Sequence, residues 1–188
     1  MNLPNKLTLF RVILIPFFVV CLYLSEATWN DGWLYGSLVI FIVASLTDLL
    51  DGKIARKYNL VTNFGKFMDP LADKLLVSAA LICFVEMELL PAWFVLIIIS
   101  REFIISGFRL VASDSGVVIA ASMWGKVKTT FQMVMIVLLL LPWCWMVGSL
   151  DLFFVLQEFF KWGSLILTIV SLIDYLYKNK GVMSEGGM

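Results

Sequence analysis

Six long apolar stretches, separated by short polar or turn-forming segments, make up most of this chain. A helix needs about 20 mostly apolar residues to cross the hydrocarbon core of a bilayer. The pattern therefore predicts an all-α integral membrane bundle of six transmembrane helices. The expected spans are 1–24, 33–57, 67 to just before Glu86, 91–112, 123–142 and 151–177. Loops are expected at 26–32, 58–66 and 113–122.

The sequence predicts a single transmembrane domain over residues 1–188, with a flexible tail at 177–188. The first span follows a basic segment, as in a signal peptide. Residues 25–28 offer no small-residue cleavage site, so a retained first span is expected. Basic residues lie on the half of each span nearer one side, with Lys161 as the exception. The positive-inside rule then places both termini in the cytoplasm.

Composition supports a membrane protein and excludes several functional classes. Hydrophobic residues make up 61% of the 188 residues, and the mean hydropathy is +0.95. The formal net charge is +0, so nucleic acid is not an expected partner. The chain has no His, which removes the commonest general base and the usual zinc ligand. The cysteines lack CxxC spacing and are interpreted as packing residues. They are Cys21, Cys83 and Cys144.

Four aspartates flank one short loop, with Asp48 and Asp51 before it and Asp69 and Asp73 after it. Residues three or four apart share a helix face, so two helix ends can present all four carboxylates to one point. Oxygen ligands suit hard divalent ions such as Mg²⁺, Mn²⁺ or Ca²⁺. The pattern predicts a metal site at the cytoplasmic face. The alternatives are solvated loop charges and, for the second pair, helix capping.

Two further groups of polar residues lie in apolar spans. One is a slowly turning stripe in the first span, formed by Asn5, Thr8 and Arg11. This stripe either anchors the helix at the interface or donates hydrogen bonds to a ligand phosphate. Arg101 lies near mid-membrane, where a charge faces the bundle interior or a wet cavity. Arg101 and Arg109 are therefore candidate site residues, and the alternative is structural pairing with Glu102 or Asp114.

Metal-binding carboxylates ringed by Arg and Lys are suited to a phosphate-bearing ligand, because cations neutralise its oxygens. A carboxylate that is not fully committed to metal could accept a proton from an attacking hydroxyl. The residues thus indicate metal-assisted transfer of a phosphate-linked group at the membrane surface. A membrane prenyltransferase would place its Asp-rich motifs in distant segments. A cation transporter would place acidic groups at mid-membrane on several helices.

The segment from Asp48 to Asp73 resembles the defining motif of the CDP-alcohol phosphotransferase family. Every motif position is filled in the run Asp48-x2-Asp51-Gly52-x2-Ala55-Arg56-x8-Gly65-x3-Asp69-x3-Asp73. The resemblance implies six transmembrane helices, two metal ions (Mg²⁺ or Mn²⁺), and transfer of a substituted phosphate from a CDP-linked donor to an alcohol. It implies that all four aspartates lie at the metal site and that Asp73 is also the general base. The implied donor-site residues are Asn5, Thr8, Arg11, Gly52, Ala55, Arg56 and Gly65.

The segments after the motif resemble the bacterial phosphatidylglycerophosphate synthase branch of that family. They read Arg101-Glu102-x3-Ser106-x2-Arg109 and Ala121-Ser122-x2-Gly125-Lys126-x-Lys128-Thr129. The resemblance implies CDP-diacylglycerol and sn-glycerol 3-phosphate as substrates, a homodimer, and a place in the bacterial cytoplasmic (inner) membrane. It implies an acceptor phosphate site formed by Arg101, Arg109, Lys126 and Lys128.

The acceptor is the part of this interpretation that the sequence leaves open. A cardiolipin, phosphatidylinositol-phosphate or phosphatidylserine synthase would share the donor motif and differ only in its acceptor. Geometry also limits the acceptor site. If residues 126–128 are helical, Lys126 and Lys128 point about 200° apart, so both reach one phosphate only through an irregular turn or a pocket that wraps around the helix.

Overall fold

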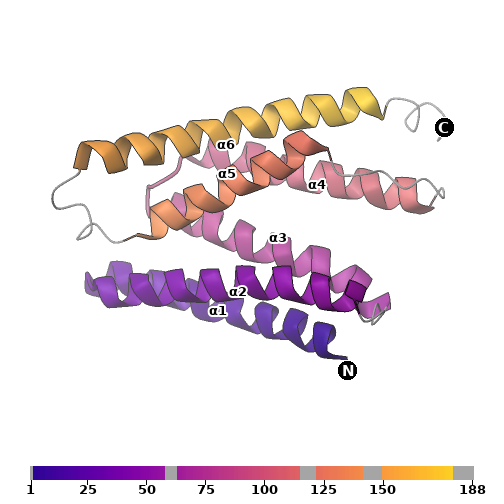
Figure 1. The fold of residues 1–188 in the computed structure, drawn as a ribbon. Helices are drawn as coiled ribbons and strands as arrows, with labels where there is room; N and C mark the ends of the chain where they lie inside the picture. Colours follow the sequence, from indigo (N-terminus) through magenta and orange to yellow (C-terminus); the bar gives the residue numbers. More distant parts are fainter. Residues whose placement is uncertain (1, 58–62, 115–121, 142–149, 180–188) are drawn as a thin grey trace. The chain divides into compact units, whose positions relative to one another are not determined.

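The computed structural model describes residues 2–57, 63–114, 122–141 and 150–179, and these fold into six α-helices (Figure 1). No strand occurs in these ranges, so the all-α class is confirmed. The helices are α1 (Leu3–Thr28), α2 (Asp31–Lys57), α3 (Asn63–Glu86), α4 (Ala92–Asp114), α5 (Met123–Leu140) and α6 (Leu150–Lys178).

Three of these helices are long and apolar enough to cross a membrane, by length and composition. They comprise Asn5–Thr28, Met123–Leu140 and Leu152–Lys178. In α4 the charges of Arg101, Glu102 and Arg109 interrupt the apolar stretch. The three apolar helices indicate a membrane protein. That all six helices cross the bilayer stays a prediction.

Two expected loops are shorter than the sequence pattern suggests. α1 continues through Thr28, and two residues separate it from α2. Trp29 ends α1 in the left-handed region, with φ 50°. α3 already begins at Asn63, so residues 63–66 are helical, whereas 58–62 lie outside the described residues. The loop boundaries were wrong here because polar residues end an apolar run without ending the helix.

Two further boundaries differ in the same way. α4 includes residues 113–114, which were expected to open a loop, and α6 includes 177–178, which were expected to open the flexible tail. The remainder of that loop before Ser122 and the rest of the tail after Asn179 lie outside the described residues. A helix therefore continues past its last apolar turn at both places.

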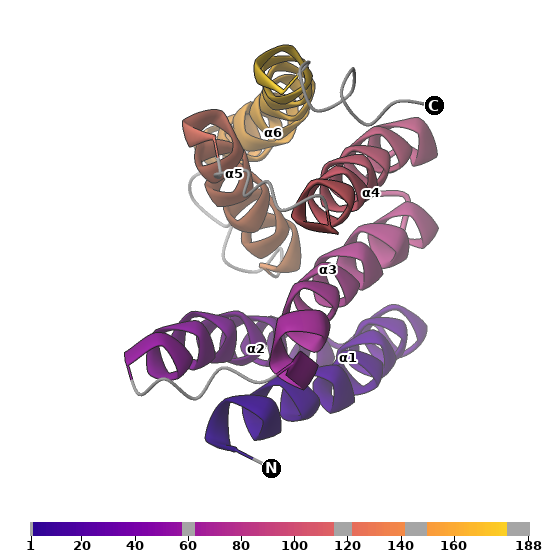
Figure 2. The ribbon, with the colours of Figure 1, turned by 90° about the vertical axis from the view of Figure 1, so that its right-hand side faces the viewer.

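The chain divides into two compact units, and a single domain over residues 1–188 stays a prediction. Unit 1 comprises Met1–Leu90 and Leu140–Trp145, and it contains α1, α2 and α3. α1 lies along both α2 and α3 (Figure 2). The rings of Phe18 and Phe41 meet between α1 and α2, with their centroids 6.0 Å apart. This antiparallel pair positions the end of α2 near the start of α1.

Unit 2 comprises Pro91–Leu139 and Met146–Met188, and it contains α4, α6 and nearly all of α5. The ring of Phe131 on α5 packs against the rings of Phe159 and Phe160 on α6, with centroids 5.8 and 5.0 Å away. Gly163 on α6 allows this approach, because a Cβ atom there would lie 2.8 Å from the Phe131 ring. α6 also contacts α4.

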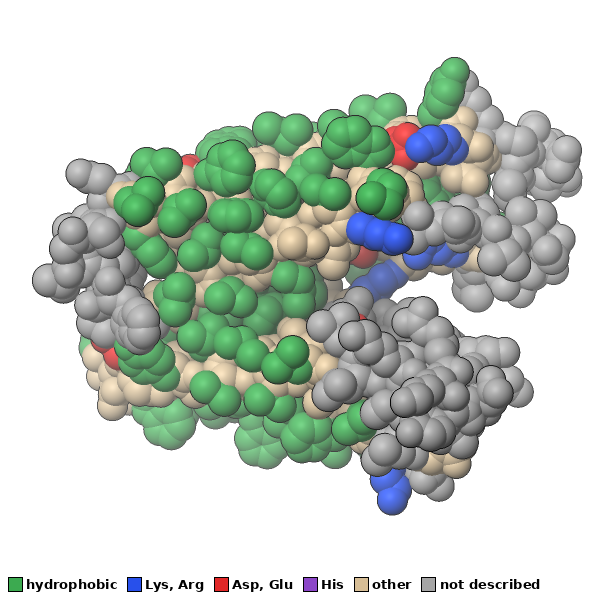
Figure 3. Space-filling view, viewed as in Figure 1, with side chains coloured by type: hydrophobic (Ala, Val, Ile, Leu, Met, Phe, Trp, Pro, Cys, Tyr) green, Lys and Arg blue, Asp and Glu red, His purple; other side chains and the backbone are tan. Residues whose placement is uncertain are grey.

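Both units expose many large hydrophobic side chains and bury several polar ones. Hydrophobic side chains cover the visible faces of α2 and α6 (Figure 3), and Phe17, Leu96 and Ile173 are all more than half exposed. Extended exposed apolar faces mark contact with lipid or with another protein. The buried positions, in contrast, include many polar side chains, which supports helix packing inside a membrane. They are Asn5, Thr8, Arg11, Ser37, Arg101, Lys128, Gln132, Ser164, Thr168 and Ser171.

Candidate functional site

The aspartate segment occupies two helix ends within unit 1. The last turns of α2 hold one part of the predicted motif, and the first turns of α3 hold the other. Both helices reach the same short connection at 58–62. The residues in α2 are Asp48, Asp51, Gly52, Ala55 and Arg56, and those in α3 are Gly65, Asp69 and Asp73. The backbone therefore brings the two halves of the motif to one end of unit 1.

Asp48 is the aspartate of this motif whose side chain the structure describes. Its Oδ1 accepts a hydrogen bond of 2.6 Å from Arg11 Nη1. Among the described side chains, no three acidic or thiol groups gather in a way that could hold a metal ion. The side chains of Asp51, Asp69 and Asp73 lie outside that set, so the metal site stays a prediction.

The polar stripe of α1 faces the interior of unit 1. Asn5, Thr8 and Arg11 are all buried, and Arg11 is only 1% exposed. A buried guanidinium needs a carboxylate or another acceptor to offset its desolvation. The Asp48 side chain meets this need from α2 while remaining about a third exposed itself. The first helix is thereby fixed to the aspartate segment.

Unit 2 holds a second charged group, which we name the α4–α5 cation cluster: Arg101, Lys128 and the Glu102 carboxylate between them. Arg101 Nη1 donates to Glu102 Oε1 at 3.1 Å, and the Lys128 ammonium forms an ion pair with the same oxygen. Arg101 Nη2 also donates to Ser171 Oγ of α6 at 3.0 Å. Both cations are buried. The pairing of Arg101 with Glu102, left open by the sequence, is present.

The other two predicted acceptor residues, Arg109 and Lys126, are exposed, unlike the buried cations of the cluster. Arg109 is exposed, and its guanidinium lies 5.8 Å from the ring centroid of Tyr175. Lys126 is exposed on α5, whereas Lys128 is buried. Because residues 126–128 are helical, the two lysines point to different sides of α5, as the geometry predicted.

α6 contributes polar contacts that sequence reasoning did not assign to the site. Asp174 accepts from Ser122 Oγ at 2.9 Å and pairs with Lys178 Nζ at 2.7 Å. Together with the bond from Arg101 to Ser171, these contacts tie α6 to α4 and to the start of α5. The signal was a polar stripe at helical spacing within an apolar span. It consists of Ser164, Thr168, Ser171 and Tyr175, all of which are buried.

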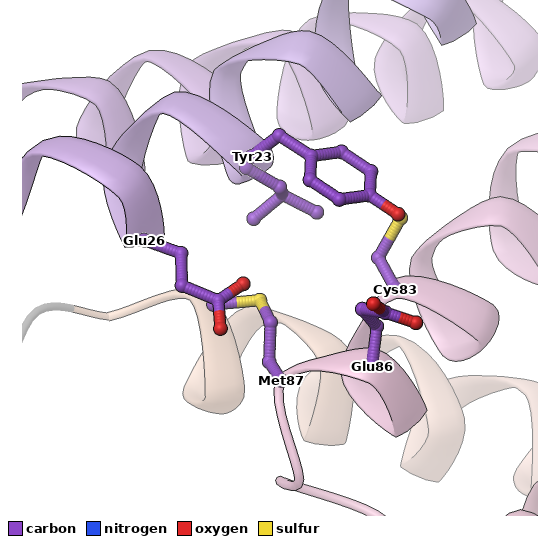
Figure 4. Close-up of a pocket in the computed structure, with 6 residues that line it drawn as sticks. Tyr23, Glu26, Cys83, Glu86 and Met87 are labelled. Atoms are coloured by element: carbon purple, nitrogen blue, oxygen red, sulfur yellow. The ribbon is translucent and has the colours of Figure 1, made fainter.

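A small pocket in unit 1 lies away from the aspartate segment (Figure 4). Glu26 and Tyr23 reach it from the end of α1, and Cys83 and Glu86 reach it from the end of α3. Glu26 follows Arg11 by about 22 Å along the helix axis at the usual rise per residue. The pocket therefore belongs to the opposite end of unit 1.

Comparison with known proteins gives consistent matches. A family model described as CDP-alcohol phosphatidyltransferase matches residues 1–170. A protein of Bacillus subtilis (strain 168) named CDP-diacylglycerol–glycerol-3-phosphate 3-phosphatidyltransferase is 47% identical over 193 residues, covering 95% of each chain. A protein of Escherichia coli (strain K12) with the same name is 42% identical over 183 residues, covering 93% of each chain. The family match extends into α6.

Proposed function

The chain belongs to the CDP-alcohol phosphatidyltransferase family, and from this we propose that it transfers the phosphatidyl group of CDP-diacylglycerol to sn-glycerol 3-phosphate. The products are phosphatidylglycerophosphate and CMP, so the enzyme serves phospholipid biosynthesis. The observation that carries this proposal is the near full-length similarity to two proteins that bear the name of this activity. The buried cations of unit 2 support it, because a phosphate monoester acceptor needs them.

The donor site is proposed at the end of unit 1 where α2 and α3 meet. A set of carboxylate oxygens on two adjoining helix ends suits Mg²⁺ or Mn²⁺, so the residues fit two such ions. Asp48, Asp51, Asp69 and Asp73 would hold them. When bound, these ions supply charge neutralisation for the diphosphate and for the departing CMP. Arg11, which pairs with Asp48, and Arg56 would contact the donor phosphates.

The other proposed donor-site residues would give the cytidine moiety room and orient the donor. Gly52 and Ala55 have little or no side chain, so a helix end that carries them can approach the cytidine moiety closely. Gly65 plays the same part at the start of α3. Asn5 and Thr8 are buried on the α1 face that carries Arg11, and they hold polar groups toward the same end of unit 1.

The transfer itself is proposed as a direct displacement. Asp73 accepts the proton of the glycerol 3-phosphate 1-hydroxyl while that oxygen forms a bond to the lipid-bearing phosphorus. The bond from this phosphorus to the CMP oxygen breaks, and CMP leaves. No His is present in the chain to take the role of base. A carboxylate is therefore the group that this sequence offers for the proton transfer.

The acceptor phosphate is proposed to bind at the α4–α5 cation cluster. Arg101 and Lys128 are both buried and both pair with Glu102, so two cations are gathered at one place where an anion could bind. Arg109 and Lys126 are exposed and would add charge at its edge. Such a cluster inside an apolar unit attracts a phosphate dianion strongly, because little water competes for it.

The membrane arrangement is proposed on the same basis. Six spans, both termini in the cytoplasm, a place in the bacterial inner membrane and a homodimer are the arrangement that the family resemblance and the positive-inside pattern support. A different acceptor alcohol is the nearest alternative within the family. A cation transporter is the alternative from another class, and the cationic character of the buried cluster in unit 2 argues against it.

One assay separates these possibilities. Purified protein in detergent–lipid micelles is given CDP-diacylglycerol, radiolabelled sn-glycerol 3-phosphate and Mn²⁺ or Mg²⁺. We expect label in chloroform-soluble lipid with equimolar release of CMP, and background incorporation after treatment with EDTA. Inositol phosphate, phosphatidylglycerol and serine serve as alternative acceptors. Efficient incorporation of one of these, without incorporation of glycerol 3-phosphate, would overturn the proposal.

A further inference from the structure

The buried Tyr175 on α6 lies against groups from α4. Its side chain is only 3% exposed. Its ring packs edge-on against Phe108, with centroids 5.8 Å apart and an interplanar angle of 82°. The Arg109 guanidinium lies 5.8 Å from the same ring. A phenylalanine at this position would make both of these ring contacts equally well.

These ring contacts do not explain why the residue carries a hydroxyl. It is buried, and within the described ranges it has no hydrogen-bond partner. Buried polar groups are nearly always hydrogen-bonded, because leaving one without a partner destabilises the fold. A tyrosine held here by packing alone would carry that penalty for no structural gain. The hydroxyl therefore points to a partner that is not part of these helices.

A second buried polar atom of the same kind belongs to Arg101, on the neighbouring helix α4. Arg101 Nε is buried and, among the residues that the structure describes, has no hydrogen-bond partner. The same guanidinium is held through Nη2 by Ser171, which lies one turn before Tyr175 on α6. Tyr175 and Arg109 are both within electrostatic range of Arg101. Two buried groups with donors unused in the described part of the chain thus lie on α4 and α6, two helices that contact each other.

The chemistry of this group selects an anion. A phenol and a guanidinium both donate hydrogen bonds, and two arginines supply positive charge beside them. Charge-assisted hydrogen bonds of this kind are characteristic of phosphate recognition. A neutral alcohol would leave the guanidinium charge without a counterion, so a phosphate oxygen is the better partner for the phenol.

We propose that the Tyr175 hydroxyl donates a hydrogen bond to the phosphate of the acceptor, between Arg101 and Arg109. α6 then takes part in choosing a phosphorylated acceptor, with Tyr175 as a specificity-determining residue and Ser171 as the positioning residue for Arg101. This inference rests on the proposed function, because it takes glycerol 3-phosphate as the acceptor.

The variant Tyr175→Phe tests this directly. It removes the hydroxyl and keeps the ring that packs on Phe108 and Arg109. We expect the KM for glycerol 3-phosphate to rise about tenfold, the usual effect of losing a hydrogen bond to a charged group. The KM for CDP-diacylglycerol should not change. Inhibition by inorganic phosphate, competitive with the acceptor, should weaken by a similar factor, and the thermal midpoint should stay equal or rise.

Tyr177→Phe is the matched control, because Tyr177 lies on the same helix with 69% of its side chain exposed. It should keep both KM values. An active wild type together with unchanged KM values in Tyr175→Phe would overturn the inference and leave the proposed function intact. A change in the KM for CDP-diacylglycerol alone would assign the hydroxyl to a lipid phosphate and also overturn it. A wild type that incorporates no glycerol 3-phosphate would overturn the proposed function and this inference together.

Discussion

The two units differ in how their buried cations are paired with carboxylates. In unit 1 the buried Arg11 guanidinium pairs with Asp48, whose side chain remains 34% exposed. In unit 2 two buried cations, Arg101 and Lys128, share one Glu102 oxygen. The first arrangement leaves carboxylate surface available, which suits ligands that are held through metal ions. The second gathers two cations at one place, which suits direct binding of an anion.

The largest effect on activity should come from the aspartate segment of unit 1. Asp73→Asn removes the proposed proton acceptor, because an amide cannot take the proton of the acceptor hydroxyl. We expect kcat to fall by about 10²- to 10⁴-fold, the usual contribution of a general base, in the radiolabel assay. Asp31→Asn, at the other end of α2, is the control and should retain wild-type activity. Wild-type turnover by Asp73→Asn would show that the base has been assigned wrongly.

Breaking the ion pair between Arg11 and Asp48 in unit 1 should show which of the two residues destabilises the fold more when its partner is lost. Asp48→Asn replaces the charged partner of the buried Arg11 with a neutral amide, and we expect the free energy of unfolding to fall by about 3–5 kcal/mol. Arg11→Met leaves a carboxylate that water can still reach, so its effect should be smaller. Thermal unfolding of the single variants and the double variant in detergent measures the difference. Equal losses from the two single variants would contradict the asymmetry.

The proposed role of the α4–α5 cation cluster is tested by replacing each of two lysines on α5. Lys128→Met removes a buried member of the α4–α5 cation cluster, and the KM for glycerol 3-phosphate should rise about 10- to 100-fold. Lys126→Met removes an exposed charge and should change this KM less than about fivefold. The KM for CDP-diacylglycerol is the internal reference. Matching KM values for the acceptor in the two variants would mean that burial does not decide the contribution.

The smallest expected effect is on stability, and it concerns the packing of α5 against α6 in unit 2. Gly163→Ala places a Cβ 2.8 Å from the Phe131 ring, and overpacking of this kind costs about 1–3 kcal/mol. Gly107→Ala is the matched control, because nothing lies within 4 Å of a Cβ there, and it should be neutral or stabilising by up to about 1 kcal/mol. Phe131→Leu should restore part of the stability of Gly163→Ala. Indistinguishable thermal midpoints for the two alanine variants would refute this explanation.

The helices were predictable from sequence because apolar runs of this length have few other structures available. Their ends were less predictable. Glu26 was expected in a loop, yet it lies within α1, which ends only where Trp29 adopts a left-handed conformation. Charged residues end an apolar run in the sequence, but a helix ends only where the backbone changes conformation. Asn63 illustrates the same point at the start of α3.

The candidate site was predictable where a motif has fixed spacing, and less so where contacts join distant helices. The sequence placed Arg11 and Asp48 near one interface, and the structure adds the hydrogen bond between residues 37 positions apart. Ser171 and Tyr175 were assigned only to an apolar last span. Their roles depend on which face of α6 meets α4, and hydropathy does not specify that face. The polar stripe on α6 was the available signal.

The two-residue turn between α1 and α2 also bears on how the chain enters the bilayer. Arg11 and Asp48 lie the same number of positions from this turn, so they reach the same depth when both helices leave the translocon as a hairpin. A lone first helix would hold this arginine without the carboxylate that pairs with it here. We therefore expect the two helices to enter the membrane together as a hairpin, with the charge pair already formed.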